Sequence, residues 1–395
     1  MKQVKRIGIL TGGGDVPGLN PVIKSVVFNA TEMGAQVIGI RRGWEGLTHM
    51  RAGAEPDAEY IRPLDRTNTY GIDRTGGTVL HTSRTNPRKM KKSRLPEHLS
   101  EERVKPLQTS GDQYNLTPIV LENIAALGLD CLIAIGGDDT LSYAQVLEDA
   151  GVPMIGIPKT MDNDVQGTEY CIGFSTAITR AKELITRQRT TIGSHERIGV
   201  FRIFGRDAGF TALYTAYVTS VRCVIPEVEF DIDALIKLLL EDKKNNPSRY
   251  ALVIASEGAV WKGRTVEEYG DADAFGHRKK VDIGQALGDE IKRRAGEETM
   301  VSDLTYDLRS GEADALDQMV AITFANVAMD LIRSGIHGRL IAVQEGKYTH
   351  APLPDPKLGA RRIDIARLYN VERYRPKYSD KLGMPLLLSA IQPSA

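Results

Sequence analysis

The sequence has few cysteines, and neither its cysteines nor its histidines are spaced like the ligands of a metal site or the pairs of a disulfide framework. Its three cysteines, Cys131, Cys171 and Cys223, are isolated from one another and follow no metal-ligand spacing. Cys131 also lies in an apolar run of the kind that forms a buried strand. This usage is typical of reduced core thiols in a cytosolic protein. The seven histidines form no ligand constellation, so we interpret them as structural or surface residues.

The sequence also lacks a surplus of charge and a long apolar run. Lysine and arginine together number 51, and aspartate and glutamate also number 51. This balance supplies no general field for nucleic acid or an anionic membrane, so any anion site has to be local. No apolar run approaches the roughly 20 residues that span a bilayer, and the glycines after Leu10 interrupt any signal-peptide core. We therefore predict a cytoplasmic protein that binds neither nucleic acid nor a membrane.

Length and pattern indicate the fold class. A chain of 395 residues exceeds the size at which one hydrophobic core usually keeps growing, so two domains are expected. Predicted strands and helices alternate over residues 118–157, which favours a parallel sheet with right-handed crossovers. The sequence therefore predicts an α/β protein.

Polar side chains gather where the predicted strand Pro153–Ile157 ends. Pro158 stops the strand, and a loop follows that carries Lys159, Thr160, Asp162 and Asp164. In an open α/β sheet, ligands bind at the carboxyl ends of strands. Taken alone, an Asp-Asn-Asp cluster is more typical of a solvated turn.

Two further strand-loop-helix units lead to the same predicted sheet edge. The apolar run Cys131–Ile135 precedes Gly-Gly-Asp138-Asp139-Thr, and the run Arg6–Leu10 precedes a glycine-rich loop around Gly13. Glycines there let backbone N–H groups approach phosphate oxygens, and a helix N-terminus adds favourable partial charge. Alternatives stay open at this point, because Asp138 and Asp139 also suit a turn and a helix N-cap, and Lys159 also suits a surface position.

The remaining segments offer weaker signals. The segment from Gly71 predicts a turn and an extended piece ending at Arg84, the first of six basic residues and the one we single out. Residues 95–116 are polar and aperiodic, which indicates a surface excursion or lid. The predicted strand in Arg197–Arg206 ends in glycine and arginine, whose planar fork suits phosphate, although an arginine there is also a common ion-pair partner. The tail after Tyr348 shows no pattern.

As a set, these loops resemble the phosphofructokinase family. Four motifs stand in family order between Arg6 and about Gln344: Gly-Gly-Gly-Asp-Val-Pro-Gly-Leu-Asn20, Gly-Gly-Asp-Asp-Thr140, Pro-Lys-Thr-Met-Asp-Asn-Asp164 with Gly-Phe-Ser-Thr-Ala177, and Phe-Gly-Arg206. Each motif alone is weak, whereas four in order are specific. The resemblance implies two Rossmann-like, three-layer domains with mainly parallel sheets and an active site in the cleft between them. It places residues 1–173 and about 308–355 in a donor domain, and 174–307 and about 356–395 in a fructose 6-phosphate domain.

The resemblance also implies roles, carried over by position. Asp162 would take the proton from the sugar 1-hydroxyl, Thr160 would orient the phosphoryl group, and Asp138 and Asp164 would hold Mg²⁺. The loop at Gly13 and the guanidinium of Arg84 would bind the donor phosphates. The sugar-phosphate positions are Arg197, Phe204, Gly205, Arg206, Glu257, Tyr306 and Arg309. In the family the arm at Arg197 comes from a neighbouring subunit, which implies a homodimer or homotetramer with shared active sites.

Departures from the common ATP-using pattern suggest the phosphoryl donor. The positions of Asp139 and Lys159 are usually glycine in ATP users, and both substitutions resemble the pyrophosphate-dependent branch. A carboxylate obstructs and repels the α-phosphate of a nucleotide, whereas a lysine supplies a compact positive charge to pyrophosphate. Two other departures are Met300, where many members have an arginine, and Tyr306, where a histidine is common.

The predicted function is therefore reversible phosphoryl transfer from pyrophosphate to the 1-hydroxyl of fructose 6-phosphate, in glycolysis and gluconeogenesis. Two alternatives remain. One is an ATP-dependent 6-phosphofructokinase, and the other is a catalytically silent, sugar-phosphate-sensing subunit.

Overall fold

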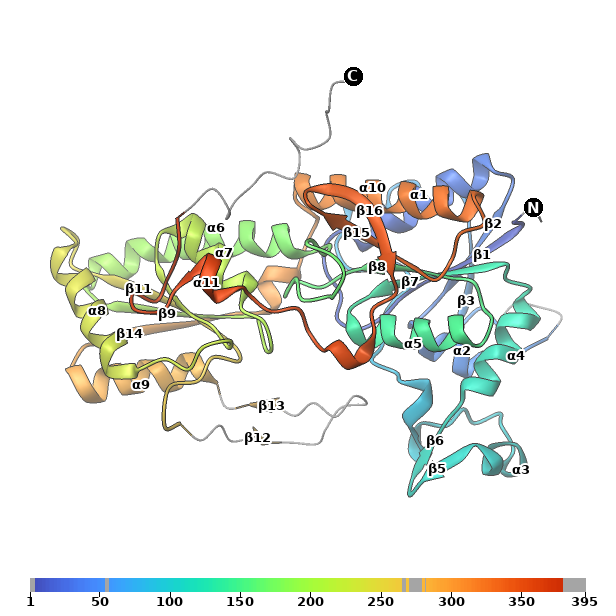
Figure 1. The fold of residues 1–395 in the computed structure, drawn as a ribbon, viewed down its shortest axis with the longest axis horizontal. Helices are drawn as coiled ribbons and strands as arrows, with labels where there is room; N and C mark the ends of the chain where they lie inside the picture. Colours follow the sequence, from blue (N-terminus) through green and yellow to red (C-terminus); the bar gives the residue numbers. More distant parts are fainter. Residues whose placement is uncertain (1–3, 54–56, 265–267, 270–278, 281, 379–395) are drawn as a thin grey trace.

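Two β-sheets organise the molecule (Figure 1). The computed structural model describes residues 4–53, 57–264, 268–269, 279–280 and 282–378. The larger sheet has seven strands in the order β16-β15-β8-β7-β1-β2-β3, and the smaller has four in the order β10-β11-β9-β14. The prediction of an α/β fold with mainly parallel sheets is confirmed.

The larger sheet is parallel at its centre. Its strands are β1 (Arg6–Thr11), β2 (Gln36–Ile40), β3 (Ile61–Leu64), β7 (Cys131–Gly136), β8 (Met154–Pro158), β15 (Arg339–Gln344) and β16 (Lys347–Pro352). Only the edge strands β3 and β16 pair antiparallel. One face packs on α1 (Leu19–Glu32) and α10 (Ala315–Arg333), and the other on α2 (Trp44–His49), α4 (Thr117–Leu127) and α5 (Asp138–Asp149). Because both faces are covered, a central strand such as β7 is apolar throughout and fully buried.

The smaller sheet is entirely parallel. Its strands are β9 (Ile198–Ile203), β10 (Arg222–Val224), β11 (Ala251–Ser256) and β14 (Thr299–Leu304), and its helices are α6 (Phe174–Ser194), α7 (Phe210–Thr219), α8 (Ile232–Asn245) and α9 (Ile283–Ala295). We propose that the domain boundaries follow these two sheets, as the sequence predicts. Residues 379–395 of the predicted second domain lie outside the described residues.

Residues 71–84 contain the predicted turn, and the piece that follows it does not join a sheet. They contain a 3-10 turn at Ile72–Arg74 and no strand. The side chain of Asn20, at the start of α1, donates to the carbonyl of Thr75 at 3.1 Å and accepts from the amide of Val79 at 2.9 Å. The backbone of this segment is therefore bound to a helix N-terminus instead of pairing with a strand.

The predicted excursion forms a small subdomain with its own apolar cluster. It contains β4 (Met90–Lys91), α3 (Glu101–Val104), β5 (Gln108–Ser110) and β6 (Gln113–Tyr114). Met90, Val104 and Tyr114 are buried together with Leu116 and Ile119 from the start of α4. These apolar residues are too widely spaced to show a period, which is why the sequence alone indicated only a surface excursion.

Helix α10 is long and apolar enough to cross a membrane by length and composition, but half of its most apolar part is buried inside the protein. The buried carboxylate of Asp317 accepts hydrogen bonds from the amides of Gly173 and Thr176 at 2.9 and 2.8 Å, and from the hydroxyl of Tyr170 at 2.7 Å. Because Gly173 and Thr176 are the N-cap and a first-turn residue of α6, we identify α10 as a core helix that fixes the position of α6.

The chain after β16 crosses from the larger sheet to the smaller one (Figure 1). It then forms α11 (Ile365–Leu368) and the short hairpin of β17 (Tyr369–Asn370) and β18 (Arg375–Pro376). The hydroxyl of Tyr369 donates to the carbonyl of Cys223 at 2.6 Å, which ties the hairpin to β10. A second short hairpin pairs β12 (Glu268–Tyr269) with β13 (Lys279–Lys280); most of the charged segment 263–280 lies outside the described residues.

Candidate active site

A cavity of about 560 Å³ lies where the carboxyl ends of strands from both sheets face each other. It contains most of the residues singled out from the sequence, on loops that follow β1, β7 and β8 of the larger sheet and β9 and β11 of the smaller one. Twelve predicted site residues line it: Gly13, Arg84, Asp138, Asp139, Lys159, Thr160, Asp162, Asp164, Phe204, Arg206, Glu257 and Arg309. The edge of a parallel sheet was thus the right place to expect a site.

The loop after β8 is anchored by its central residue. Asn163 is buried and adopts a left-handed backbone (φ 53°), which asparagine tolerates better than most residues. Its side chain donates to the carbonyl of Glu169 at 3.0 Å and accepts from the amide of Cys171 at 2.8 Å. Asn163 therefore points into the protein while Asp162 and Asp164 line the cavity. A simple solvated turn does not describe this arrangement.

The carboxylates of the cavity repel one another. Burial raises the pKa of Asp162, and Asp164 and Glu257 raise it further, whereas Arg206 lowers it. Burial, with Asp164, Asp139 and Asp207 nearby, raises the pKa of Asp138 to about 7. Ionised carboxylates held this close favour a bound cation.

Asp138 and Asp164 suit Mg²⁺ in number and chemistry. Within the described residues, no group of three or more His, Cys, Asp or Glu side chains is close enough together to form a ready metal site. Mg²⁺ typically uses one or two carboxylates and completes its shell with water and substrate phosphates. The pair of aspartates matches that pattern.

Lys159 is a buried cation in the cavity. Its side chain is only 4 % exposed, and its ammonium donates to the carbonyl of Gly14 at 2.5 Å. Burial, with Arg309 and Arg84 nearby, lowers its pKa to about 8, although the carboxylate of Asp15 opposes this shift. The lysine is thus protonated at neutral pH and surrounded by other cations, so it is not a surface lysine.

The glycine loop brings backbone close to these cations. A side chain at Gly13 would begin 3.4 Å from the ammonium of Lys159, and one at Gly14 would begin 3.0 Å from the guanidinium of Arg309. The amides of Gly12 and Gly13 already donate to the carbonyls of Ile135 and Ser83, at 2.9 and 3.0 Å. The absence of side chains at these glycines therefore leaves space for the side chains of Lys159 and Arg309. The amide of Gly13 already donates to a protein carbonyl, so it is not the N–H group of this loop that would bind a phosphate oxygen.

Asp139 lies in the first turn of α5, one residue after its start at Asp138, and the N-cap is Gly137. Asp139 is therefore not the helix N-cap. A helix N-terminus attracts anions, and here the two carboxylates of the first turn occupy that favourable field. Asp139 also lines a neighbouring pocket together with Tyr143 and Arg88, so it stands between that pocket and the cavity.

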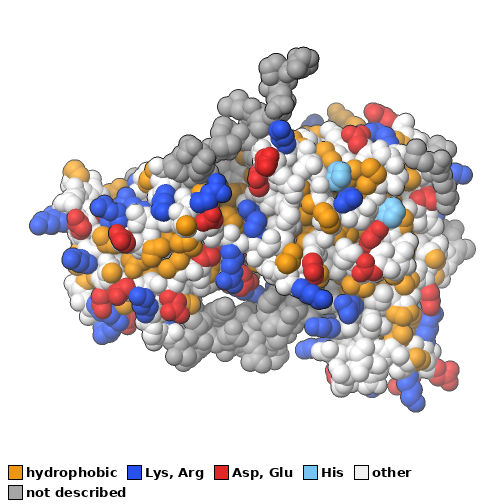
Figure 2. All heavy atoms as spheres, in the orientation of Figure 1, with side chains coloured by type: hydrophobic (Ala, Val, Ile, Leu, Met, Phe, Trp, Pro, Cys, Tyr) orange, Lys and Arg blue, Asp and Glu red, His pale blue; other side chains and the backbone are white. Residues whose placement is uncertain are grey.

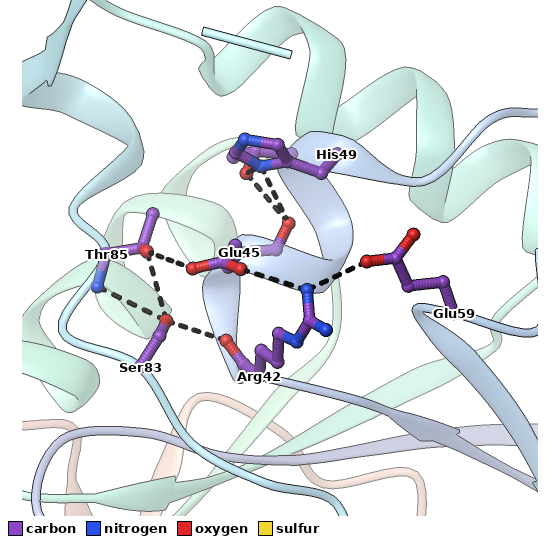
Figure 3. Close-up of polar contacts among 7 residues, drawn as sticks. Arg42, Glu45, His49, Glu59, Ser83 and Thr85 are labelled. Atoms are coloured by element: carbon purple, nitrogen blue, oxygen red, sulfur yellow. Dashed lines mark hydrogen bonds and ion pairs between the residues drawn. The ribbon is translucent and has the colours of Figure 1, made fainter. Parts of the chain in front are cut away.

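Arg84 is carried by a segment with well-defined polar support (Figure 3). The hydroxyl of Ser83 donates to the carbonyl of Arg42 at 2.7 Å, and the hydroxyl of Thr85 donates to the carboxylate of Glu45 at 3.3 Å. Arg42 in turn lies between Glu45 and Glu59, at 3.6 and 3.0 Å. These contacts hold the backbone on both sides of Arg84, whose side chain lines the cavity.

The small-sheet side of the cavity is built on the ends of β9 and β11. Gly205 has a left-handed backbone (φ 122°), and a side chain there would collide with Ser256. Gly205 itself is not a lining residue, but it lets Phe204 and Arg206 face the cavity. The backbone of Arg206 also bonds to the carboxylate of Asp162, which connects the two halves of the site.

Besides Gly205, two predicted residues do not line the cavity of a single chain. Tyr306 is 70 % exposed and packs under the guanidinium of Arg309, at 4.6 Å from the ring centre. Arg197 precedes β9, whereas Phe204 follows it. A six-residue strand is about 20 Å long, so Arg197 lies at the opposite edge of the sheet. Met300, in β14, pairs with Gly199 near that same edge.

Sequence reasoning missed several lining residues. Asp15 lies inside the first recognised motif and Asp207 directly follows the motif that ends at Arg206, so their positions were a usable signal. Gly359, Ala360 and Arg362 also line the cavity. They lie in the tail, where no pattern pointed to a site.

Comparison with known proteins identifies the class. A family model described as Phosphofructokinase matches residues 6–332. A pyrophosphate–fructose 6-phosphate 1-phosphotransferase of Dictyoglomus thermophilum is 37 % identical over 93 % of this chain and 98 % of its own length. An ATP-dependent 6-phosphofructokinase 3 of Streptomyces coelicolor is 35 % identical over 93 % of this chain and 99 % of its own length. The chain therefore belongs to the phosphofructokinase family, and its activity is that of a phosphofructokinase.

Solved structures support the same fold. The pyrophosphate-dependent phosphofructokinase of Marinobacter aquaeolei superposes with a TM-score of 0.71 at 17 % identity, covering 95 % of this chain and 89 % of that one. Phosphofructokinase from Saccharomyces cerevisiae gives 0.69 at 23 % identity, covering 88 % of this chain and 44 % of that one. Similar relatives use either donor, so the donor has to be argued from the site.

Proposed function

We propose that this chain is a pyrophosphate-dependent phosphofructokinase that forms fructose 1,6-bisphosphate and phosphate from fructose 6-phosphate and pyrophosphate. The observation that carries the proposal is the pair Asp139 and Lys159. Lys159 is a buried ammonium beside the glycine loop and near Arg309 and Arg84, where a compact polyanion would gain most. Asp139 adds a negative charge at the helix terminus where a nucleotide phosphate would otherwise bind.

The proposed mechanism uses positioning, charge neutralisation and one base. Asp162 accepts the proton of the 1-hydroxyl as that oxygen attacks in line. Lys159 and Arg84 offset charge on the donor, and Thr160 orients the transferred group. Mg²⁺, held by Asp138 and Asp164, would supply further neutralisation of phosphate charge when bound. Arg206, Arg309 and Glu257 hold the sugar phosphate and its hydroxyls, with Phe204 and Gly205 shaping that side and Tyr306 at its rim.

The observations bear differently on the two alternative functions. An ATP-dependent enzyme is supported by the similar identity of relatives that use ATP. A silent sugar-phosphate sensor is disfavoured because Asp138, Asp162 and Asp164 are all present and all line the cavity.

The donor test is direct. With fructose 6-phosphate and Mg²⁺, we expect kcat/KM to be higher with pyrophosphate than with ATP, and we expect fructose 1,6-bisphosphate with phosphate to regenerate pyrophosphate. Both donors are titrated in one coupled assay, with fructose 1,6-bisphosphate formation measured directly as a control on the coupling enzymes. A higher kcat/KM with ATP would refute the donor proposal while leaving the family assignment intact.

We also propose that active sites are shared between chains in a homodimer or homotetramer, because Arg197 lies about one strand length (about 20 Å) from the cavity of its own chain. Mixing Asp162→Ala and Arg197→Ala chains, each nearly inactive, is expected to restore activity, since mixed oligomers then contain some intact sites. The matched control mixes Asp162→Ala with Asp164→Ala, whose positions belong to one loop, and no activity should return. Full activity of the dissociated wild-type monomer would contradict sharing.

A further inference from the structure

The segment of residues 353–364, called the strap below, joins the two halves of the molecule (Figure 1). At one end, Leu353 is buried against the larger sheet and its amide donates to the carbonyl of Gly338 at 3.4 Å. At the other end, Ile363 is buried and its amide donates to the carboxylate of Glu227 at 3.1 Å. Glu227 also accepts from the amide of Gly209 at the start of α7, at 3.0 Å. The strap is therefore fixed on both sides of the cavity.

Arg361 attaches the strap to the backbone of the proposed catalytic loop. Its amide donates to the carbonyl of Asp164 at 2.6 Å, and its guanidinium donates to the carbonyls of Asn163 and Glu169 at 2.5 and 3.2 Å. The guanidinium also lies 4.2 Å above the ring of Phe210. One side chain thus holds the left-handed turn between Asp162 and Asp164 from behind.

Arg362 faces the cavity itself. It lines the cavity with Gly359 and Ala360, and it forms no hydrogen bond or ion pair with any described residue. The cavity lining is acidic overall, with carboxylates at Asp15, Asp138, Asp139, Asp162, Asp164, Asp207 and Glu257 and cations at Arg84, Lys159, Arg206, Arg309 and Arg362. Because the substrates are phosphate anions, a guanidinium that has no partner within the described part of the chain is well placed in such a lining to bind them.

Lysine and arginine side chains also gather along the junction of the two halves on the face drawn in Figure 2. The match to the family model ends at residue 332, so the strap lies beyond the matched region.

We propose that the strap is part of the active site, with Arg361 as a positioning residue for the Asp162–Asp164 loop and Arg362 as a binding residue for a substrate phosphate. The phosphate belongs to the donor or to the sugar phosphate, and the chemistry of recognition is the same for both. This inference rests on the phosphofructokinase activity and holds for either donor.

The first test replaces Arg362. Arg362→Ala is expected to raise KM for the donor, fructose 6-phosphate or fructose 1,6-bisphosphate about 10- to 100-fold, the range of a lost charge-assisted hydrogen bond. Arg362→Lys should recover part of that loss. The matched control is Arg367→Ala, an exposed arginine in α11 just beyond the strap, which should stay within about twofold. Which KM rises identifies the phosphate that Arg362 binds, and no KM change beyond the control would overturn its role.

The second test replaces Arg361 by lysine, which keeps the charge but loses the planar fork that reaches two carbonyls. We expect kcat to fall about tenfold or more, with KM and calorimetric fructose 6-phosphate affinity near the wild type. An unchanged kcat would overturn the positioning role, as would an equal loss of kcat, affinity and melting temperature, which would indicate a structural role alone. The wild-type donor assay is independent of these variants, so failure of the proposed donor is distinguishable from failure of this inference.

Discussion

Asp162→Asn is expected to lower kcat by about two to four decades, the range attributed to a positioned general base. Asparagine keeps the shape of the side chain but has no basic oxygen at neutral pH. Fructose 6-phosphate affinity should remain near the wild-type value, because the residues proposed to hold the sugar phosphate are unchanged. The measurement is steady-state kinetics with a calorimetric titration of fructose 6-phosphate on the same sample.

The same variant should not lose stability. Burial and the neighbouring carboxylates raise the pKa of Asp162 in the folded protein. A carboxyl whose folded pKa is raised contributes stability below its unfolded pKa and loses it as pH rises through the folded pKa. Ionisation of Asp162 is therefore less favourable in the folded than in the unfolded protein, and a neutral amide, which has no charge to desolvate, should leave the melting temperature equal or higher. Turnover near the wild-type rate would remove the assignment of the base, whatever the stability.

Asp139→Gly and Lys159→Gly are expected to change donor choice in different ways. Lys159→Gly alone should impair use of pyrophosphate without creating use of ATP, because the carboxylate of Asp139 still opposes a nucleotide phosphate. Asp139→Gly should begin to admit ATP, since both the bulk and the charge at the start of α5 are removed. The double variant should shift the preference further, because the charge that favours the small donor is then also absent.

The contacts of Asp139 and Lys159 limit how far the donor preference can shift. Each of these two charges makes a desolvated contact worth up to a few kcal/mol, so the change from pyrophosphate to ATP need not be complete. The quantity to measure is the ratio of kcat/KM for pyrophosphate to that for ATP in the wild type, both single variants and the double variant. Lys159→Met is the matched control for the cavity that glycine leaves, because it removes the charge and keeps most of the volume. A ratio that does not move in the double variant would show that other residues choose the donor.

Local order along the chain predicted much of this protein. The motifs around Gly13, Asp138, Lys159 and Arg206 each follow an apolar strand, and parallel strands bring their carboxyl ends to one edge. That rule is local and geometric, so it predicted without any knowledge of contacts that the loops of Gly13, Asp138 and Lys159 would meet in one cavity. The places of Glu257 and Arg309 in that cavity were implied by the family resemblance instead.

Only the tertiary structure shows the positions of residues that are held by partners distant in sequence. The segment 71–84 is held by Asn20 on α1, and the amide of Gly13 is taken by the carbonyl of Ser83, which no local pattern records. Arg197 and Arg206 stand at the two ends of one strand, and only the completed sheet shows that a single chain cannot bring both to the cavity. Arg361 and Arg362 lie in a part of the sequence without periodicity. Arg361 is positioned by its contacts with the Asp162–Asp164 loop, and Arg362 lines the cavity, so neither belongs to a helix or strand whose pattern could have been recognised. Periodicity reports burial on regular elements, whereas a crossing segment is positioned by single contacts, which a sequence does not reveal.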